Sequence, residues 1–391
     1  MRNAILALNA GSSSLKFGLY EASSSEELRS VARGAIALGD PPGLAAKAPD
    51  GSLLLKKEMP GAALRDLVGE LISWIEGESG GRELAAAGHR IVHGGSRFSD
   101  PILLTPDVIE EVEKLTPLAP LHQPRSVSPI RALQAVRPDL PQIGCFDTAF
   151  HRTMDANARR FALPRRFEAK GVRRYGFHGL SYEYIAFRLR QIAPELAAGR
   201  VVVAHLGNGA SLCALQDGRS VDTTMGFSAL DGLVMGTRCG AIDPGVLLYL
   251  LQEEGFSPAD LQHLLYEESG LKGVSGISGD VRALSESGDP RAREALELFA
   301  FRAARETAAL ANTLGGLDGL VFTAGIGEHS ASVRAAICAR LEWLGVRIDQ
   351  AANEAHAELI GAPDSAVDVR VIATDEELVL ARHVLSAMEG Q

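Results

Sequence analysis

The sequence predicts an α/β protein built from two similar domains. The first observation is a central stretch in which the β-branched run Val201–His205 and the apolar run Leu212–Leu215 flank a turn that reads Gly-Asn-Gly-Ala-Ser. The dipeptide Asp217-Gly218 then leads into another extended segment, so the stretch has the pattern of a hairpin followed by one more strand. Glycines let the backbone of such a turn approach a ligand, and its amides can bind an anion, so we expect a phosphate site here.

The second observation is the same order of segments at the N-terminus. Ala4–Leu8 and Leu15–Tyr20 flank a turn that reads Asn-Ala-Gly-Ser-Ser-Ser, and its Asn9 stands about half the chain length before Asn208. Either turn alone is also typical of an ordinary hairpin, because these residues dominate turns. Two such turns at matching places favour an internal duplication, whose period is far too long for a solenoid. We therefore expect two domains that face each other, with a phosphate-binding hairpin on each side of a central cleft.

Size and composition agree with this organisation. A chain of 391 residues has room for two or three domains with complete cores. Its net charge of −10 argues against a nucleic-acid partner, which needs a concentrated positive field. No apolar run approaches the length of a membrane span, and Ala4–Leu8 is too short for the core of a signal peptide. The four cysteines include no CxxC pair, so we expect free thiols in a cytoplasmic protein without membrane partners.

The first quarter of the chain alternates strands with helices. Short strands are expected before residue 60, and apolar positions three and four apart predict a helix over Ala62–Ile75. Ala87–Asp100 reads as a strand that contains Arg90 and ends at a glycine turn. Thr105 has the pattern of an N-cap with a proline after it, which predicts a helix over Thr105–Leu115.

The segment that follows has two candidate site residues. Residues 117–129 are rich in proline, so we expect irregular structure that holds His122 on a constrained loop before a helix over Ser128–Val136. Gln142–Phe146 predicts a strand with Asp147 at its carboxyl end. Ligands of open α/β sheets bind at the carboxyl ends of strands, which makes Asp147 a candidate site residue.

Two segments of the second half favour a functional role. A Gly-Phe-His-Gly turn presents His178 just before a helix expected from Ser181, although a lone histidine is more often structural. Residues 223–244 form a long loop with many glycines, and loops of this length inside a compact domain are usually functional. Arg238 in this loop could clamp a phosphate with its planar guanidinium, or simply be exposed on the surface.

The remaining elements end in a further Gly-rich turn and a last helix. Helices are expected over 246–254, 258–269 and 291–314, with a Gly/Ser-rich loop at 271–280. A strand at Gly319–Thr323, a Gly-rich turn at 324–329 and a helix at Ser330–Leu341 form a candidate nucleotide site, which lacks the third glycine of a dinucleotide fingerprint. After a strand at Val369–Ile372, Thr374 with Glu377 predicts a capping box, so acidic residues there are expected from the helix dipole alone.

Five stretches, in this order along the chain, together resemble the acetate kinase family. They are Asn9–Lys16, Gly88–Gly95, Phe146–His151, His205–Ser211 and Thr374–Leu378. The chain has no Gly-Lys dipeptide and therefore no P-loop, so phosphates must be held by the hairpins and arginines.

The resemblance implies fold, activity and assembly. The fold is that of the acetate and sugar kinase/actin-like superfamily, with two duplicated actin-like (ribonuclease H-like) ATPase domains and a central cleft. Residues 1–149 with 375–391 form the N-terminal domain, and residues 150–374 form the C-terminal domain on the nucleotide and dimer side. The activity is reversible transfer of the γ-phosphoryl group of ATP to acetate, giving acetyl phosphate and ADP, with Mg²⁺ or Mn²⁺ as cofactor. The assembly is a homodimer.

The resemblance also implies a role for each matching position. Arg90 and Arg238 flank the acetate carboxylate and the transferring phosphoryl group, His178 stabilises that group, and Asp147 aligns substrate or metal. Asn9 and Glu376 hold the metal, Lys16 lies by the phosphates, and Val92, Leu121 and Phe177 form the apolar pocket for the methyl group. His122 completes the substrate-binding group and lines the phosphate cleft with His205, Asn208 and Gly209, while Asp280, Arg282, Gly325 and Ile326 surround the nucleoside.

Some positions depart from the family pattern and leave alternatives open. Ala324 and His329 replace a usual Gly and Asn near the nucleoside, which leaves the preference for the phosphoryl donor open. Ala229 replaces a usual Pro beside the acyl pocket, which makes propionate or butyrate an alternative acceptor, whereas Val92 favours acetate. An alternative of another class is an actin-like ATPase without an acyl acceptor, although such an enzyme does not need arginines for a carboxylate. Tyr182 also replaces a usual His.

Overall fold

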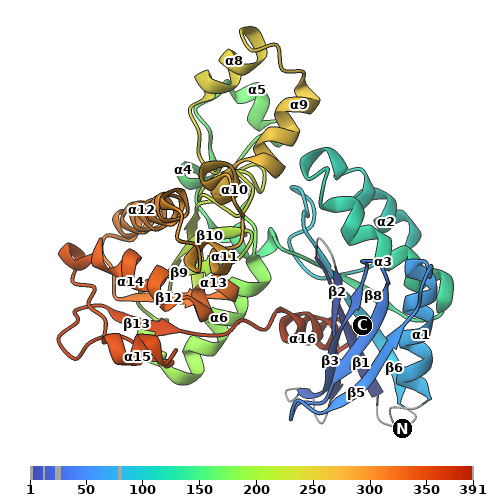
Figure 1. Ribbon diagram of the computed structural model, residues 1–391. Coiled ribbons are helices and arrows are strands. Elements are labelled where there is room, and N and C mark those ends of the chain that lie inside the picture. Colours follow the sequence, from blue (N-terminus) through green and yellow to red (C-terminus); the bar gives the residue numbers. More distant parts are fainter. Residues whose placement is uncertain (1–2, 12–13, 23–27, 78–81, 390–391) are drawn as a thin grey trace. The chain divides into compact units, whose positions relative to one another are not determined.

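The computed structural model describes residues 3–11, 14–22, 28–77 and 82–389. Ser12 and Ser13 of the predicted N-terminal turn lie outside the described residues. The chain divides into two compact units, which we describe separately (Figure 1). Unit 1 comprises Met1–Ala149 and Asp375–Gln391, and unit 2 comprises Phe150–Thr374.

Unit 1 is built on a mixed eight-stranded sheet of order β5-β4-β3-β2-β1-β6-β8-β7. Its central strand β1 pairs antiparallel with β2 and parallel with β6, and β6 pairs parallel with β8. The strands are β1 Asn3–Ala10, β2 Ser14–Ala22, β3 Leu28–Ala37, β4 Gly43–Lys47, β5 Leu53–Glu58, β6 Glu83–Ile91, β7 Ile102–Leu103 and β8 Gln142–Phe146.

Helices cover both faces of this sheet (Figure 1). The helices are α1 Leu64–Glu76, α2 Pro106–Glu113, η1 Thr116–Leu118, α3 Gln123–Val136 and α16 Glu376–Glu389. α1 and α3 contribute Leu67, Leu71 and Leu133 to a core cluster that also contains Leu6 and Ala87 of the sheet. α16 packs on the other face of the sheet. Successive side chains of a strand point to opposite faces, so the residues between those of the core cluster face α16.

Close packing of α16 depends on a glycine in the middle of β6. A Cβ built at Gly88 would lie 2.7 Å from Cγ2 of Val384 and 3.3 Å from the carbonyl oxygen of Leu380, both in α16. Only glycine allows this approach without a shift of the helix. The last helix of the chain is thereby part of the core of the N-terminal unit.

Unit 2 repeats the central strand order of unit 1. Its sheet has the order β11-β10-β9-β12-β13, where β9 pairs antiparallel with β10 and parallel with β12. The five strands β3-β2-β1-β6-β8 of unit 1 have the same order and the same directions. The predicted duplication and α/β fold class are therefore confirmed. The strands are β9 Arg200–Leu206, β10 Ala210–Gln216, β11 Arg219–Thr223, β12 Gly319–Thr323 and β13 Asp368–Val371.

The helices of unit 2 pack on its sheet and extend beyond it (Figure 1). α6 packs on one face through Tyr182, Ile185 and Leu189, and the long helix α12 contacts β9, β10 and β11. The helices are η2 Ala149–Thr153, α4 Ala156–Arg159, α5 Arg165–Glu168, α6 Gly179–Ile192, α7 Pro194–Ala197, α8 Pro244–Gln252, α9 Pro258–His263, η3 Leu264–Glu268, α10 Gly270–Ser275, α11 Val281–Ser285, α12 Pro290–Leu314, α13 Ala324–His329, α14 Ala331–Ala339, η4 Glu342–Leu344 and α15 Gln350–Glu354. Within the described ranges, no helix is both long enough and apolar enough to cross a membrane.

The structure corrects four local predictions. The proline-rich segment is not irregular throughout, because α3 begins at Gln123, where Pro124 occupies a first-turn position that needs no amide donor. The Gly-rich turn at 324–329 is the helix α13, and residues 271–275 of the predicted loop belong to α10. The capping box is also wrong: Asp375 Oδ1 accepts from Leu378 N, whereas Thr374 Oγ1 has no hydrogen-bond partner among the described residues.

Candidate active site

Arg90 and Asp147 lie at the carboxyl ends of two neighbouring parallel strands of unit 1, β6 and β8. Arg90 donates from Nε and Nη2 to Asp147 Oδ2 at 2.8 and 2.5 Å. Burial by itself lowers the pKa of Arg90, but the charges of Asp147 and then Glu376 outweigh it and raise this pKa above its ordinary value. The guanidinium is therefore cationic and fixed in direction by a buried carboxylate.

Asn9 links this pair to the start of α16. Asn9 Nδ2 donates to Glu376 Oε2 and to Glu377 Oε1, each at 2.9 Å, and Asn9 Oδ1 accepts from Arg90 Nη1 at 3.1 Å. Arg90 Nη1 also lies 3.6 Å from Glu376 Oε2. Burial, followed by the charge of Glu376, raises the pKa of Glu377 above its ordinary value. The cluster thus concentrates negative charge around one arginine.

The residues around Asn9 fit a magnesium ion in chemistry. Asn9 Oδ1 and the Glu376 carboxylate are hard oxygen donors on buried residues, and Mg²⁺ prefers such donors. Within the described part of the chain, no group of three or more His, Cys, Asp or Glu side chains could form a metal cage. These donors suit an ion that keeps waters and shares substrate phosphates, which is the usual mode for Mg²⁺ in kinases.

The other predicted residues of unit 1 lie near this cluster in the fold. Lys16 of β2 is the register partner of Asn9 on β1 and is exposed. Val92 follows β6 and is buried, and its N–H donates to Ser126 Oγ of α3 at 3.3 Å. Leu121 and His122 are half-buried where α3 begins, with His122 in its N-cap position rather than on the predicted constrained loop. The end of β6 and the start of α3 therefore lie together.

In unit 2, His178 is held in an unusual backbone conformation by its turn. It has φ = 57°, in the left-handed region, at the N-cap of α6. Its Nδ1 is 2.8 Å from Ser211 Oγ, and the same hydroxyl lies 2.5 Å from the Tyr182 hydroxyl. The preceding Phe177 is buried and its carbonyl oxygen bonds His151 Nε2 at 2.9 Å. Strained residues that are fixed on both sides occur often at functional sites.

Sequence reasoning did not assign a role to Ser211, Tyr182 or Ser181, which orient the two imidazoles. The ring of His178 stacks on that of His205 with centroids 4.1 Å apart, and His205 Nδ1 is 2.8 Å from Ser181 Oγ. Ser211 belongs to the central Gly-Asn-Gly-Ala-Ser turn and was recognisable as a polar residue at the phosphate hairpin. Ser181 and Tyr182 lie in the first turn of α6. Only the folded structure brings them next to His205 of β9 and Ser211 of β10.

The hairpin between β9 and β10 also lies against the Arg238 loop. A Cβ built at Gly209 would be 3.5 Å from His178 Nε2 and 3.6 Å from Arg238 Nη1, so these three residues lie together. Arg238 Nη1 donates to the carbonyl oxygen of Ala229 at 3.1 Å. Gly236 N donates to the carbonyl oxygen of Asn208 at 3.1 Å. The loop that sequence analysis singled out is thus hydrogen-bonded to the predicted phosphate hairpin.

A cavity of about 840 Å³ in unit 2 collects the predicted nucleoside residues. Its predicted lining residues are Asn208, Asp280, Arg282, Gly325 and Ile326. Asp280 caps α11 by accepting from Ala283 N at 2.8 Å, and the exposed Arg282 lies 3.2 Å from Glu286. Sequence analysis did not assign Ser285, Ser330, Ser332 or His356, which also line this cavity. For His356 no local signal existed, because it comes from a segment far along the chain.

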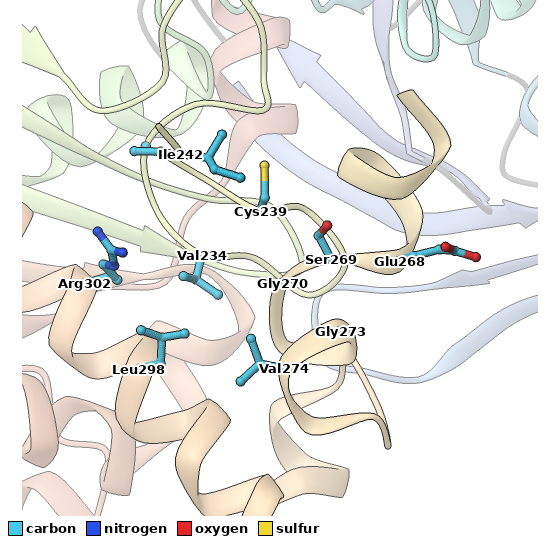
Figure 2. A pocket seen from close by; sticks show the side chains of 12 residues that line it. Val234, Cys239, Ile242, Glu268, Ser269, Gly270, Gly273, Val274, Leu298 and Arg302 are labelled. Carbon is cyan, nitrogen blue, oxygen red and sulfur yellow. The ribbon is translucent and has the colours of Figure 1, made fainter. Parts of the chain in front are cut away.

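A second cavity, of about 360 Å³, is lined in part by residues of the loop that carries Arg238. Figure 2 shows Leu298 and Arg302 of α12 on one side of it, Val274 of α10 below, and Cys239 and Ser269 opposite. Burial raises the pKa of the Cys239 thiol above its ordinary value, so the thiol is not a reactive thiolate. Of the predicted site residues, all of which the structure describes, none lines this cavity.

Comparison with known proteins gives one consistent result. The model of the acetokinase family matches residues 4–382. The chain is 52% identical to an acetate kinase of Rhodopseudomonas palustris, with 100% of both chains covered. Among solved structures, a propionate kinase from Francisella tularensis has a TM-score of 0.90 at 37% identity, with 97% of this chain and 98% of that chain covered. An acetate kinase of Porphyromonas gingivalis has a TM-score of 0.86 at 36% identity, with 99% and 100% covered.

These matches span both units, and they agree with the duplicated α/β fold and with the motifs found in the sequence. The identity over the full length is well above what fold similarity alone requires. The chain belongs to the acetokinase family, the family of the acetate kinases.

Proposed function

We propose that this enzyme transfers the γ-phosphoryl group of ATP reversibly to acetate, giving acetyl phosphate and ADP. The observation that carries the proposal is the geometry of Arg90, a cationic guanidinium fixed by the buried Asp147 beside the oxygen donors of Asn9 and Glu376. Such an arginine can bind a carboxylate and neutralise charge on a phosphoryl group. Membership of the acetokinase family supports acetate as the carboxylate and ATP as the source of the phosphoryl group.

The proposed step needs no base. A carboxylate oxygen of acetate attacks the γ-phosphorus, and the bond from this phosphorus to the β,γ-bridging oxygen breaks as ADP leaves with the bonding electron pair. Acetate enters ionised, so no proton is transferred. Positioning and neutralisation of charge then account for the catalysis. In the reverse direction, the terminal phosphate oxygen of ADP attacks acetyl phosphate.

We assign the residues of unit 1 to the acceptor and the metal. Arg90 binds the acetate carboxylate and the transferring phosphoryl group, Asp147 holds Arg90, and Val92 with Leu121 contacts the methyl group. Asn9 and Glu376 hold Mg²⁺, with Lys16 near the phosphates. When bound, Mg²⁺ neutralises phosphate charge and orients the donor.

The residues of unit 2 are assigned to the donor. His178 and Arg238 stabilise the transferring phosphoryl group, and His205, Asn208 and Gly209 line the phosphate path, a role that we also assign to His122 of unit 1. Phe177 contributes to the acyl pocket. Asp280, Arg282, Gly325 and Ile326 surround the nucleoside, and their presence in one cavity with Asn208 supports this assignment.

The experiment is a hydroxamate assay with purified protein, Mg²⁺, ATP and acetate, propionate or butyrate. Acyl hydroxamate that is strongest with acetate supports the proposal. The variant Arg90→Lys should lose most of this activity. Its matched control is Arg97→Lys, because Arg97 is an exposed arginine of the same unit. ATP hydrolysis that does not depend on any acid, without hydroxamate, would instead support an actin-like ATPase.

Propionate is a second candidate acceptor because of one residue. The family resemblance implies a position beside the acyl pocket for Ala229, where a proline is usual, and the carbonyl oxygen of Ala229 accepts from Arg238. A larger pocket at this position lowers discrimination against one extra methylene, which is worth only about 1–3 kcal/mol. Comparison of kcat/KM for acetate and propionate, in the wild type and in Ala229→Pro, tests this. We expect the substitution to favour acetate.

We also propose a cytoplasmic homodimer formed through α8 of unit 2. In the described structure no residue of this helix is buried, although Val246, Leu248, Tyr249 and Leu251 are large and apolar. Such a helix favours a partner surface. Sedimentation should give a dimer for the wild type and a monomer for Leu248→Glu, with Leu54→Glu on β5 as the control. The four free cysteines agree with a reducing compartment.

A further inference from the structure

Arg334 of α14 is a fully buried arginine that uses all of its hydrogen-bond donors. Nε donates to Asn353 Oδ1 at 2.7 Å, and Nη2 donates to the carbonyl oxygen of Asn353 at 2.7 Å. Nη1 donates to the carbonyl oxygens of Gly327 and Glu328 at 2.8 and 2.9 Å. The remaining donor of Nη2 lies 3.0 Å from His356 Nδ1. Every acceptor is a neutral group, and no carboxylate pairs with this guanidinium among the described residues.

These contacts hold two walls of the 840 Å³ cavity in place, although Arg334 itself does not line it. Gly327 and Glu328 belong to the last turn of α13, whose carbonyl oxygens have no partner within the helix, and an arginine is suited to cap them. His356 follows α15 in the left-handed region, with φ = 52°. Both α13 and His356 line the cavity, whereas Arg334 does not. Arg334 therefore sets the distance between these walls without touching the space they enclose.

The contact with Arg334 also determines which nitrogen of His356 carries the proton. A guanidinium has only donors, so the imidazole Nδ1 must accept in this hydrogen bond. The ring N–H is then at Nε2. The neighbouring His329 ring lies edge-on at 6.3 Å between centroids, so the two imidazoles form one wall of the cavity. His356 is exposed, and its Nε2–H is available as a donor at that wall.

We propose that His356 binds the phosphoryl donor, and that its Nε2–H donates to a hydroxyl oxygen or ring nitrogen of the nucleoside. Arg334 is the positioning residue that holds the imidazole in this orientation. The inference rests on the assignment of this cavity to the nucleotide under the proposed function. It adds a nucleoside contact from the segment after α15, outside the motifs that carry the family resemblance.

The test compares binding of MgATP, measured by calorimetry without acetate, in the wild type and in His356→Asn. Asparagine tolerates the left-handed backbone, but its shorter amide does not reach the position of Nε2. We expect Kd to rise about fivefold, as for the loss of one hydrogen bond. KM for ATP should rise by the same factor, with kcat and KM for acetate unchanged. His263→Asn is the matched control, an exposed histidine of α9 that should leave Kd unchanged.

A second measurement reports the role of Arg334. Nitrogen-15 NMR of the histidine rings should show the Nε2–H form for His356 in the wild type and a mixture of both forms in Arg334→Lys, which also raises KM for ATP more than it lowers kcat. Because a buried arginine can be essential for folding, His356→Asn decides the matter if Arg334→Lys does not fold.

The outcomes separate this inference from the proposed function. Unchanged ATP affinity in His356→Asn, or an Nδ1–H form in the wild type, overturns the inference even if the protein phosphorylates acetate. If the wild type forms no acyl hydroxamate but His356→Asn still weakens MgATP binding, the inference stands and the proposed acceptor is wrong.

Discussion

The guanidinium of Arg90 contacts acidic or amide groups on three segments of unit 1. Asp147, Asn9 and Glu376 lie within 3.6 Å of its nitrogens; Asp147 follows β8, Asn9 belongs to β1 and Glu376 to α16. Removal of the whole side chain would leave the buried Asp147 without its cation, which is costly. Arg90→Ala therefore confuses loss of function with loss of stability, and a substitution that keeps the charge is the better probe.

For Arg90→Lys we expect a folded protein that has lost most of its kcat. An ammonium can pair with Asp147 but cannot present a planar fork to a carboxylate and a phosphoryl group. Arginines at such transition states contribute roughly 10³–10⁵ in rate, so kcat should fall by about 10³ or more. Steady-state assays and thermal melting check this, with Arg97→Lys as control. Turnover near that of the wild type would show that Arg90 does not have this role.

Tyr182 also acts at the scale of single residues. It replaces the histidine usual in the family, yet its hydroxyl lies 2.5 Å from Ser211 Oγ, which in turn bonds His178. In Tyr182→Phe, Ser211 loses one of two partners and holds the imidazole less firmly. We expect kcat to fall about fivefold and the free energy of unfolding to fall by about 1 kcal/mol. An unchanged kcat together with the loss of stability would restrict Tyr182 to packing.

At the scale of elements, β6 and η2 each carry a buried histidine. Burial lowers the pKa of His89 and of His151 to about 4. Between pH 6.5 and 4, the unfolded chain binds protons at these histidines that the folded protein does not. Their contribution to stability is therefore complete above pH 6.5 and is lost as pH falls towards 4.

We expect each histidine to lower the free energy of unfolding by about 2 kcal/mol between pH 7.5 and pH 5. Urea unfolding at both pH values measures the total effect. His89→Gln removes one of the two groups, so its loss of stability on acidification should be smaller than that of the wild type by about this amount. Equal losses in the two proteins would show that His89 titrates normally.

Elements were predicted well where the local sequence determines them. The strands at Gln142–Phe146 and Gly319–Thr323 are found with the predicted bounds, and the helix capped by Thr105 is found over Pro106–Glu113, two residues shorter at its end than predicted. Apolar periodicity and capping act over a few residues, so the local sequence is enough to predict them. The start of α3 was missed because its prolines were taken as helix breakers, whereas Pro124 occupies the first turn and the helix holds Pro129 in its interior. α13 was missed because Ala324 adopts a left-handed conformation, φ = 64°, that glycine usually supplies.

For the molecule as a whole, the last helix completes the first unit. Leu380 and Val384 of α16 are fully buried against the sheet of unit 1, although that unit otherwise ends at Ala149. Unit 2 has its own core around β9, β12 and α6. The two units therefore differ in how strongly they depend on the end of the chain.

We expect a chain that ends at Thr374 to lose structure in unit 1 but to keep it in unit 2. Without α16, the face of the first sheet that this helix contacts exposes apolar residues, and Glu376 is removed from the proposed metal site. Hydrogen exchange should show rapid exchange in β1 and β6, with β9 and β12 still protected. Met388→Ala, at a partly exposed position of α16, is the control. Protection of β1 in the shortened chain would contradict this expectation.

The candidate site could be predicted only in part from the sequence. Arg90 lies within a predicted strand, Asn9 and Asp147 follow predicted strands, and Glu376 lies at the start of the predicted last helix. The motifs of the family identified all four. Ser211 stands in a recognised hairpin, but its two partners come from α6. Arg334 and His356 carried no signal, because their importance lies in a contact between α14 and the segment after α15.

By itself, the sequence determined the alternation of strands and helices, the duplication and the family. These depend on periodicity, turn residues and motif order, all of which act locally or repeat along the chain. Only the tertiary structure decided which side chains satisfy one another: Asp147 with Arg90, Asp375 as the cap of α16, and Arg334 with His356. The physical reason is that a buried polar group needs a partner, and the fold brings that partner from anywhere in the chain.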